Sequence, residues 1–323
     1  MAGPDRWQEF LANLVSLLPA GTAAVRVDGP GQLRRLVAGK LAAAVRAAGL
    51  PVTVSDGPSS GRPGGPGGRD WDAVIWVRSE RGGHTRQGDG EQTATIVADL
   101  HDPDWPVIRH VASPLASGGR WYVAETRAFF APRAATWDSR FGDDMPAYAA
   151  AIAAARLAPG AVVLDIGAGT GRALPPLRQA VGPDGTVIAI DLTPEMLRHA
   201  RTVGRAGYAA LVVADARRLP FAAAAADAVF AAGLINHLPD PEAGLRQLAR
   251  VTRPGGQLVL FHPTGRAALA ARHGRTLDPG EPLAAGPLQR LTSATGWRLT
   301  AYDDGEQRFL AIATRQLGGP ARP

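Results

Sequence analysis

The fold is decided by the stretch Val162-Val163-Leu164-Asp165-Ile166-Gly167-Ala168-Gly169-Thr170-Gly171-Arg172, in which an apolar run gives way to three glycines spaced two apart. The β-branched residues before the first glycine favour a buried strand. Glycines placed directly after a strand let the backbone approach a ligand where a Cβ would clash, and a following helix presents its free amides there. The stretch therefore predicts a ligand loop at the carboxyl end of a parallel strand.

Strand and helix segments alternate around this loop. We expect strands over 161–166, 186–190, 210–214, 226–231 and 257–261, separated by helices over 172–180, 194–203 and 241–252. The turn Asp303-Asp304-Gly305-Glu306 predicts a final hairpin, which a helix over 286–296 precedes. This alternation predicts an α/β fold with a doubly wound parallel sheet.

Acidic residues stand at the ends of two of these strands. Asp191 ends the second strand, where a carboxylate can accept hydrogen bonds from both ribose hydroxyls of an adenosine. Asp215 ends the third strand, where it can meet the exocyclic amine of adenine. A glycine loop alone would also suit a nicotinamide dinucleotide, but that fingerprint needs a glycine at the position of Arg172.

Five segments, in order, resemble the motifs of class I S-adenosylmethionine (SAM) dependent methyltransferases. They are VVLDIGAGTGRALPPL (162–177), IAIDLTPEML (188–197), VVADARRLPF (212–221), DAVFAAGLINHLPDP (227–241) and LARVTRPGGQLVLF (248–261). The resemblance is to the type 11 and menaquinone/ubiquinone methyltransferases. It implies a Rossmann-like seven-stranded sheet of order 3-2-1-4-5-7-6 over 119–323, with SAM as cofactor and S-adenosylhomocysteine (SAH) as product.

The resemblance also implies roles for matching positions. Cofactor contacts would come from Asp165, Gly167, Ala168, Gly169, Gly171, Asp191, Leu192, Met196, Asp215, Ala216 and Gly233. For Met196, a place in the helix core is an equal alternative. Methyl transfer depends mainly on proximity and alignment, and a general base is needed only for a tightly held proton. His237 and His262 are the candidates for that base, with a loop or helix-start position as the alternative for His237.

Residues 1–118 form a separate region, for which we expect a small α/β domain. The strand leading into Val27-Asp28-Gly29-Pro30, between two helices, resembles the P-loop region of uridine kinase-like proteins. The phosphate-binding pattern itself is missing, because Gly39-Lys40 lies inside a helix and precedes Leu41 rather than Ser or Thr. A degenerate kinase-like scaffold is therefore expected, followed by a glycine- and proline-rich loop over 57–69.

Composition narrows the function further. The chain has no cysteine, which excludes disulfides, thiolate nucleophiles and cysteine metal sites, and no compact set of histidines and carboxylates predicts a metal centre. The net charge of +6 is scattered, so a nucleic-acid partner is not expected. Without an apolar span or a secretory leader, we expect a cytoplasmic bacterial enzyme.

The expected activity is methyl transfer to O, N or C of a small molecule. The polar segment 263–282, which contains His273, is either a cap over the acceptor or a solvated loop. Two alternatives stay open: a SAM-binding regulatory or partner protein without turnover, and a methyltransferase acting on RNA. The oligomeric state and the acceptor are not specified by the sequence.

Overall fold

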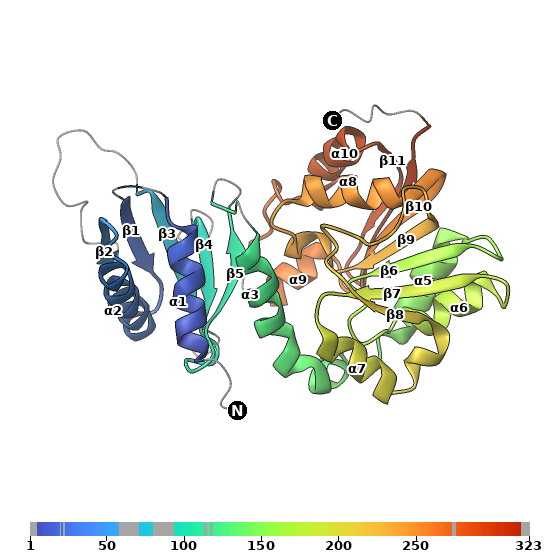
Figure 1. The fold of residues 1–323 in the computed structure, drawn as a ribbon. Helices are drawn as coiled ribbons and strands as arrows, with labels where there is room; N and C mark the ends of the chain where they lie inside the picture. Colours follow the sequence, from blue (N-terminus) through green and yellow to red (C-terminus); the bar gives the residue numbers. More distant parts are fainter. Residues whose placement is uncertain are drawn as a thin grey trace. The chain divides into compact units, whose positions relative to one another are not determined.

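A computed structural model describes residues 5–19, 21, 23–57, 71–79, 94–112, 115–116, 119–272 and 276–317 of the 323-residue chain. The chain divides into two compact units, Met1–Ala128 and Phe129–Pro323 (Figure 1). Nearly all of the loop expected over 57–69 lies outside the described residues, and so does His273.

The first unit is built on a five-stranded sheet of order β2-β1-β3-β4-β5. Its strands are β1 (Ala23–Asp28), β2 (Val52–Asp56), β3 (Ala73–Arg78), β4 (Ile96–Asp99) and β5 (Val107–Val111). The neighbours from β2 to β4 pair in parallel, and β5 runs antiparallel to β4. The helices are α1 (Arg6–Leu17), α2 (Gly31–Ala47) and the start of α3 (Arg120–Phe130).

The boundary between the units lies inside α3, ten residues beyond the division expected between 118 and 119. Glu125 of α3 is fully buried and pairs with Arg6 of α1. Its carboxylate also accepts hydrogen bonds from Asn13 Nδ2 (2.6 Å) and from the Ile108 backbone N–H (2.7 Å). A buried carboxylate needs such partners, so most of α3 folds with the first unit.

The second unit is built on a seven-stranded sheet of order β11-β12-β10-β9-β6-β7-β8. Its strands are β6 (Val162–Ile166), β7 (Thr186–Asp191), β8 (Ala210–Val213), β9 (Ala226–Ala232), β10 (Thr252–His262), β11 (Trp297–Asp304) and β12 (Phe309–Arg315). β12 runs antiparallel to both β10 and β11, and the neighbours from β10 to β8 pair in parallel. Counted from β6, the order reads 3-2-1-4-5-7-6, and the parallel-dominated α/β class expected from the alternation is confirmed.

Helices precede and connect these strands, and Figure 1 labels α5 to α10 around the sheet. They are α4 (Trp137–Phe141), α5 (Met145–Ala155), α6 (Leu174–Val181), α7 (Pro194–Thr202), α8 (Pro241–Val251), α9 (Arg266–Arg272) and α10 (Ala285–Ala294). Three short 3-10 turns are η1 (Ala131–Thr136), η2 (Arg205–Tyr208) and η3 (Ile235–His237). Every residue from Val163 to Ile166 of β6 is buried, as expected for a central strand covered on both faces.

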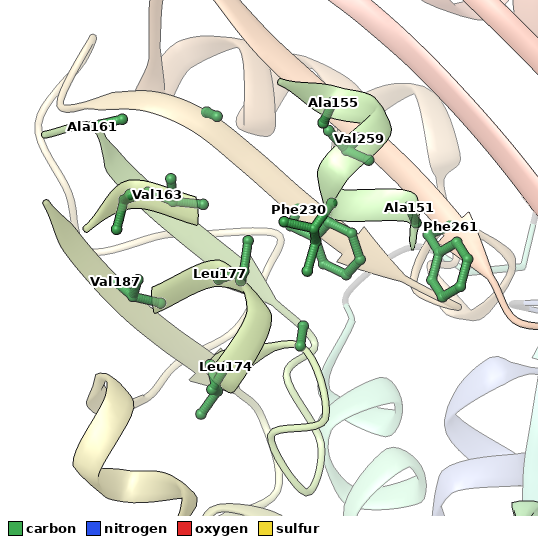
Figure 2. Packing of buried hydrophobic residues seen from close by; sticks show 14 of the residues in the cluster. Ala151, Ala155, Ala161, Val163, Leu174, Leu177, Val187, Phe230, Val259 and Phe261 are labelled. Atoms are coloured by element: carbon green, nitrogen blue, oxygen red, sulfur yellow. The ribbon is translucent and has the colours of Figure 1, made fainter. Parts of the chain in front are cut away.

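One part of the core of the second unit lies between α5, α6 and the sheet. Leu174 and Leu177 of α6 belong to one cluster with Val163 and Val187 of the first two strands (Figure 2). Phe230 and Phe261, from β9 and β10, lie beside α5, with their ring centroids 5.9 Å apart. This packing holds β6, β7, β9 and β10 in register, so their carboxyl ends form one fixed edge.

The opposite, amino edge is held by a polar contact. Asp227 at the start of β9 accepts a hydrogen bond from the Val162 backbone N–H (2.7 Å) and pairs with Arg253. These bonds hold the pKa of Asp227 below its ordinary value. The contact joins the beginnings of β9, β6 and β10.

Candidate functional site

The glycine loop leaves β6 at its carboxyl end and turns back over β7. The backbone N–H groups of Gly167 and Ala168 both donate to the carbonyl of Ile190, at 2.8 and 3.0 Å. Gly167, Gly169 and Gly171 have φ of 76°, 55° and 79°, a region that favours glycine. An added Cβ at Gly169 would meet no atom within 4 Å, so the loop leaves open space beside its centre.

Asp191 stands next to this loop at the end of β7. Its Oδ2 accepts a hydrogen bond from the Gly169 backbone N–H (2.8 Å), and its Oδ1 accepts one from the Thr193 N–H (2.7 Å). Burial raises its pKa, although both bonds act in the opposite direction. Each carboxylate oxygen has two acceptor sites, so Asp191 keeps acceptor capacity for a ligand.

Asp165 lies beneath the loop and is 1% exposed. Its Oδ2 is buried and has no hydrogen-bond partner among the described residues. Burial, together with the nearby Asp191, raises the pKa of Asp165 to about 8. A buried acceptor without a donor costs free energy, which suits a site that a cationic or hydrogen-bonding ligand completes.

The other residues expected near an adenine are differently placed. Asp215 follows β8, and its carboxylate pairs with Arg217 at 2.7 Å and accepts the Arg217 backbone N–H (2.9 Å). Ala216 is buried, and Leu192 is half-buried at the end of β7. Met196 is 2% exposed in α7. Arg217 Nε also lies 3.1 Å from both Asp215 oxygens, so each oxygen has two contacts with Arg217, and an adenine amine would displace one of them.

Two histidines follow the ends of β9 and β10. His262 lies beside Gly233, where an added Cβ would be 3.9 Å from the His262 Cδ2. Its Nδ1 lies 2.8 Å from the Thr264 carbonyl and 3.1 Å from the Thr264 N–H. Burial lowers the pKa of His262, which favours the neutral ring. His237 lies in η3, with its ring edge-on to Phe130 at 5.7 Å.

The loop after β9 also meets the glycine loop. An added Cβ at Gly167 would lie 3.3 Å from the Leu234 Cδ1, so Leu234 packs directly over the first glycine. Asp191 therefore contacts the glycine loop at Gly169, and the glycine loop contacts the β9 loop at Gly167. The β9 loop lies beside His262 at Gly233. The structure therefore places the ends of β6, β7, β9 and β10 around one site.

A polar cluster before β6 was not predicted from the sequence. Asp138 of α4 accepts a hydrogen bond from Thr170 Oγ1 (2.5 Å) and pairs with Arg205 (2.7 Å) and Arg172 (3.2 Å). Arg172 also pairs with Asp144 and is itself buried. Only the position of Arg172 directly after the last loop glycine hinted at a side-chain role there.

The segment 263–282 is anchored rather than loose in its described part. Arg266 of α9 is buried and pairs with Asp304 (3.1 Å) and Glu281 (3.2 Å). Gly265 packs so closely on the Gly305 carbonyl that an added Cβ would lie 1.6 Å from its oxygen. The segment is therefore tied to the β11–β12 turn.

Two kinds of site are absent from the described ranges. No group of three or more His, Asp or Glu side chains there could hold a metal ion. Nor is any described helix both long and apolar enough to cross a membrane. A shallow cavity of about 640 Å³ lies between α5, α6 and η2, and none of the expected cofactor residues lines it.

Comparison with known proteins agrees with this geometry. The family model described as a methyltransferase domain matches residues 164–260, from β6 to β10. The matched residues include the glycine loop, Asp191, Asp215 and the β9 loop.

Curated relatives of the methyltransferase domain include an uncharacterized protein of Mycobacterium tuberculosis, 40% identical over 158 residues that cover 48% of this chain and 54% of that protein. The O-methyltransferase cnsE of Penicillium expansum is 33% identical, with 46% and 57% covered. The ubiquinone/menaquinone biosynthesis C-methyltransferase UbiE of Ectopseudomonas mendocina is 37% identical, with 35% and 46% covered. The chain spans about half the length of these relatives.

Solved structures similar to the chain include a SAM-dependent methyltransferase from Aquifex aeolicus. It is 23% identical with a TM-score of 0.44, and the match covers 60% of this chain and 98% of that one. Magnesium protoporphyrin IX methyltransferase from Synechocystis, with bound SAH, is 18% identical with a TM-score of 0.47, and the match covers 59% and 98%.

Proposed function

We propose that the methyltransferase domain binds SAM at the carboxyl edge of its sheet and transfers the methyl group to O, N or C of a small-molecule acceptor. The observation that carries this proposal is the glycine loop with Asp191 beside it. The loop leaves open space at Gly169, and Asp191 ties the Gly169 amide while keeping acceptor capacity for ribose hydroxyls. The cnsE and UbiE relatives, named for O- and C-methylation, support the reaction class.

The residues of the site suit the parts of this cofactor. Asp165, with its unpartnered Oδ2, would accept from the ammonium group of the methionine part. Gly167, Ala168, Gly169 and Gly171 would line the methionine and ribose, with Asp191 on the ribose hydroxyls. Leu192 and Met196 would lie against the adenine, Asp215 and Ala216 at its edge, and Gly233 near the sulfonium.

A bound cofactor would supply a methyl group activated on its sulfonium, and the glycine loop, Asp191 and Gly233 would hold that group towards the acceptor. The protein provides alignment and excludes water, which for well-oriented reactants contributes roughly 7–11 kcal/mol. Leu234, packed over Gly167, would shield the transfer from solvent.

Of the two histidines, His262 is the better candidate for the general base. A bond from its Nδ1–H to the Thr264 carbonyl would leave the Nε2 lone pair available, and burial lowers the pKa of the ring. An acceptor hydroxyl or ammonium near Gly233 would lose its proton to this nitrogen. His237, edge-on to Phe130, is the second candidate.

Calorimetry with SAH tests the cofactor site directly. Asp191→Ala removes the ribose acceptor and releases the Gly169 amide, so we expect SAH binding to fall below detection. Asp227→Ala is the matched control, because Asp227 also holds a backbone N–H and an arginine, at the opposite edge of the sheet. Normal SAH affinity in the Asp191 variant would contradict the assignment.

Turnover is tested by incubating the protein and methyl-labelled SAM with a small-molecule extract and, separately, with RNA. Label in a small molecule supports the proposal. Label in RNA would assign the alternative acceptor class. SAH binding without any labelled product from either fraction would favour a regulatory protein that binds SAM without turnover.

A further inference from the structure

The carboxylate of Asp138 lies outside the sheet and yet contacts the glycine loop. Asp138 belongs to α4, before the first strand of the methyltransferase domain, and none of the roles proposed above uses it. We propose that Asp138 is a positioning residue for the cofactor loop, holding Thr170 and thereby the glycines on either side of it. This inference rests on the proposed SAM site.

Thr170 is held at two points, and both depend on Asp138. The Thr170 hydroxyl donates to the Asp138 Oδ1 at 2.5 Å. Arg205 Nη1 donates to the Asp138 Oδ2 at 2.7 Å and to the Thr170 carbonyl at 2.9 Å. Thr170 is 1% exposed, so its side chain has no access to solvent hydrogen bonds that could replace these. Asp138 therefore fixes the hydroxyl directly and the carbonyl through Arg205.

Two further basic side chains lie near the same carboxylate. Arg172 Nε donates to the Asp138 Oδ1 at 3.2 Å, and the His199 Nε2 of α7 lies 4.0 Å from the Oδ2. Burial alone would raise the pKa of Asp138, but hydrogen bonds from Thr170, Arg205 and Arg172 hold it below its ordinary value. The carboxylate is thus ionised at neutral pH, and charge-assisted hydrogen bonds of this kind are the strong ones.

The contacts place Asp138 opposite Asp191 along the loop. Asp191 takes the Gly169 N–H from the β7 side, and Asp138 takes Thr170 from the α4 side. Gly169 and Thr170 are adjacent in the loop, but Gly169 is hydrogen-bonded to β7 and Thr170 to α4. If the Asp138 tie is lost, Thr170 loses its hydroxyl partner while Arg172 keeps Asp144 as an anchor. The expected result is a folded domain with a less ordered cofactor loop.

The test is a double-mutant cycle on SAH affinity in the full chain, with the unfolding midpoint measured for each variant. Asp138→Ala removes the carboxylate, whereas Thr170→Val removes only the hydroxyl and leaves every charge in place. We expect Asp138→Ala to weaken SAH binding at least about tenfold and Thr170→Val to weaken it several-fold. The double variant should bind about as Asp138→Ala does, because the two changes remove the same contact.

Asp227→Ala serves as the control, since it loses an arginine-paired carboxylate of the same domain away from the loop. We expect it to lower the unfolding midpoint and leave the SAH affinity unchanged. If Asp138→Ala does not fold, Thr170→Val decides: weaker SAH binding at an unchanged midpoint supports the inference.

Two outcomes would overturn the inference. One is wild-type SAH affinity in Asp138→Ala or, where that variant is unfolded, in Thr170→Val. Strictly additive losses in the double variant are the other, since these would indicate independent structural effects. If the wild-type chain itself fails to bind SAH, the proposed function fails, and this inference fails with it.

Discussion

At the scale of single residues, the three loop glycines differ in what a methyl group would meet. An added Cβ would lie 2.8 Å from the Leu174 Cδ1 at Gly171 and 3.3 Å from the Leu234 Cδ1 at Gly167, but it would meet nothing at Gly169. A methyl group at the first or last glycine would therefore press on the end of a leucine side chain, in addition to the strain of the positive φ. At Gly169, the open space and the positive φ indicate that glycine is needed to leave room for a ligand.

Gly169→Ala should accordingly cost little stability and much affinity. The left-handed backbone of an alanine there costs roughly 1–2 kcal/mol. SAH affinity should fall at least about tenfold, because the Cβ fills the space that the cofactor would occupy. Gly182→Ala is the control: its φ is 70°, it has no atom within 4 Å of an added Cβ, and it follows α6 away from the loop. Equal affinities in the two variants would refute this role for Gly169.

Asp165 predicts a pH dependence of stability. Burial and Asp191 raise its pKa to about 8, well above the value of a carboxyl in the unfolded chain. Between those two values the folded state binds the extra proton, so this group's contribution to the free energy of unfolding falls as pH rises through the window. Asp165→Asn cannot ionise and should lose less stability than the wild type between about pH 5 and about pH 8. Denaturant unfolding at several pH values gives the free energy of unfolding of both proteins. If it changes with pH in the same way for Asp165→Asn and for the wild type, the prediction is wrong.

The site was partly predictable at this scale. Glycines after an apolar strand and an acid at the end of the next strand are short-range patterns, so Gly167, Gly169 and Asp191 could be identified as neighbours from the sequence. Asp138 could not, because it meets Thr170 across 32 positions of chain from a five-residue helix with no periodic pattern. The pairing of Asp215 with Arg217 was equally hidden, since either residue alone suits a solvated surface.

At the scale of elements, strands rich in Val, Ile and Ala could be located between helices, because a strand covered on both faces needs apolar residues throughout. Strand β5 was missed, since its sequence Val107–Val111 includes an arginine and a histidine and it lies at a sheet edge. The first unit ends ten residues beyond the expected division, and no local sequence pattern shows that Glu125 of α3 pairs with Arg6 of α1.

Glu125 therefore gives the prediction at the element scale. Removing one partner of a buried ion pair costs about 3–5 kcal/mol, so Glu125→Ala should strongly lower the unfolding midpoint of the first unit. Glu9→Ala removes the second partner of Arg6, and it is the control because the Glu9 side chain is 40% exposed. Glu9→Ala should lower the free energy of unfolding by less than about 1 kcal/mol. Circular dichroism during thermal unfolding compares the two variants. Similar unfolding midpoints for Glu125→Ala and Glu9→Ala would contradict the role given to Glu125.

At the scale of the whole molecule, the division into two units can be tested by truncation. A chain of residues 1–130 keeps Glu125 with Arg6 and Asn13, whereas a chain of residues 1–118 lacks that carboxylate. We expect the longer chain to unfold cooperatively and the shorter one to leave Arg6 buried without its partner and to be much less stable. Hydrogen exchange of α1 amides in the two chains measures this, and equal protection would return the boundary to 118.

The resemblance of the first unit to uridine kinase-like proteins stays a prediction. Its mainly parallel sheet suits an α/β unit, and α2 begins at Gly31 directly after β1. A role in choosing the acceptor would be tested by exchanging that unit with one from a relative and comparing labelled products.

The tie between Asp191 and the Gly169 amide has a consequence for the energetics of recognition. A loop whose Gly169 amide and Thr170 hydroxyl are both bonded within the protein loses little conformational entropy when a ligand binds. Association should then resemble docking into a rigid receptor, with small backbone displacement and a favourable enthalpy. Differences in acceptor choice would then arise in the segments around the cofactor loop. The same preorganised loop could serve many acceptors as those segments diverge in sequence.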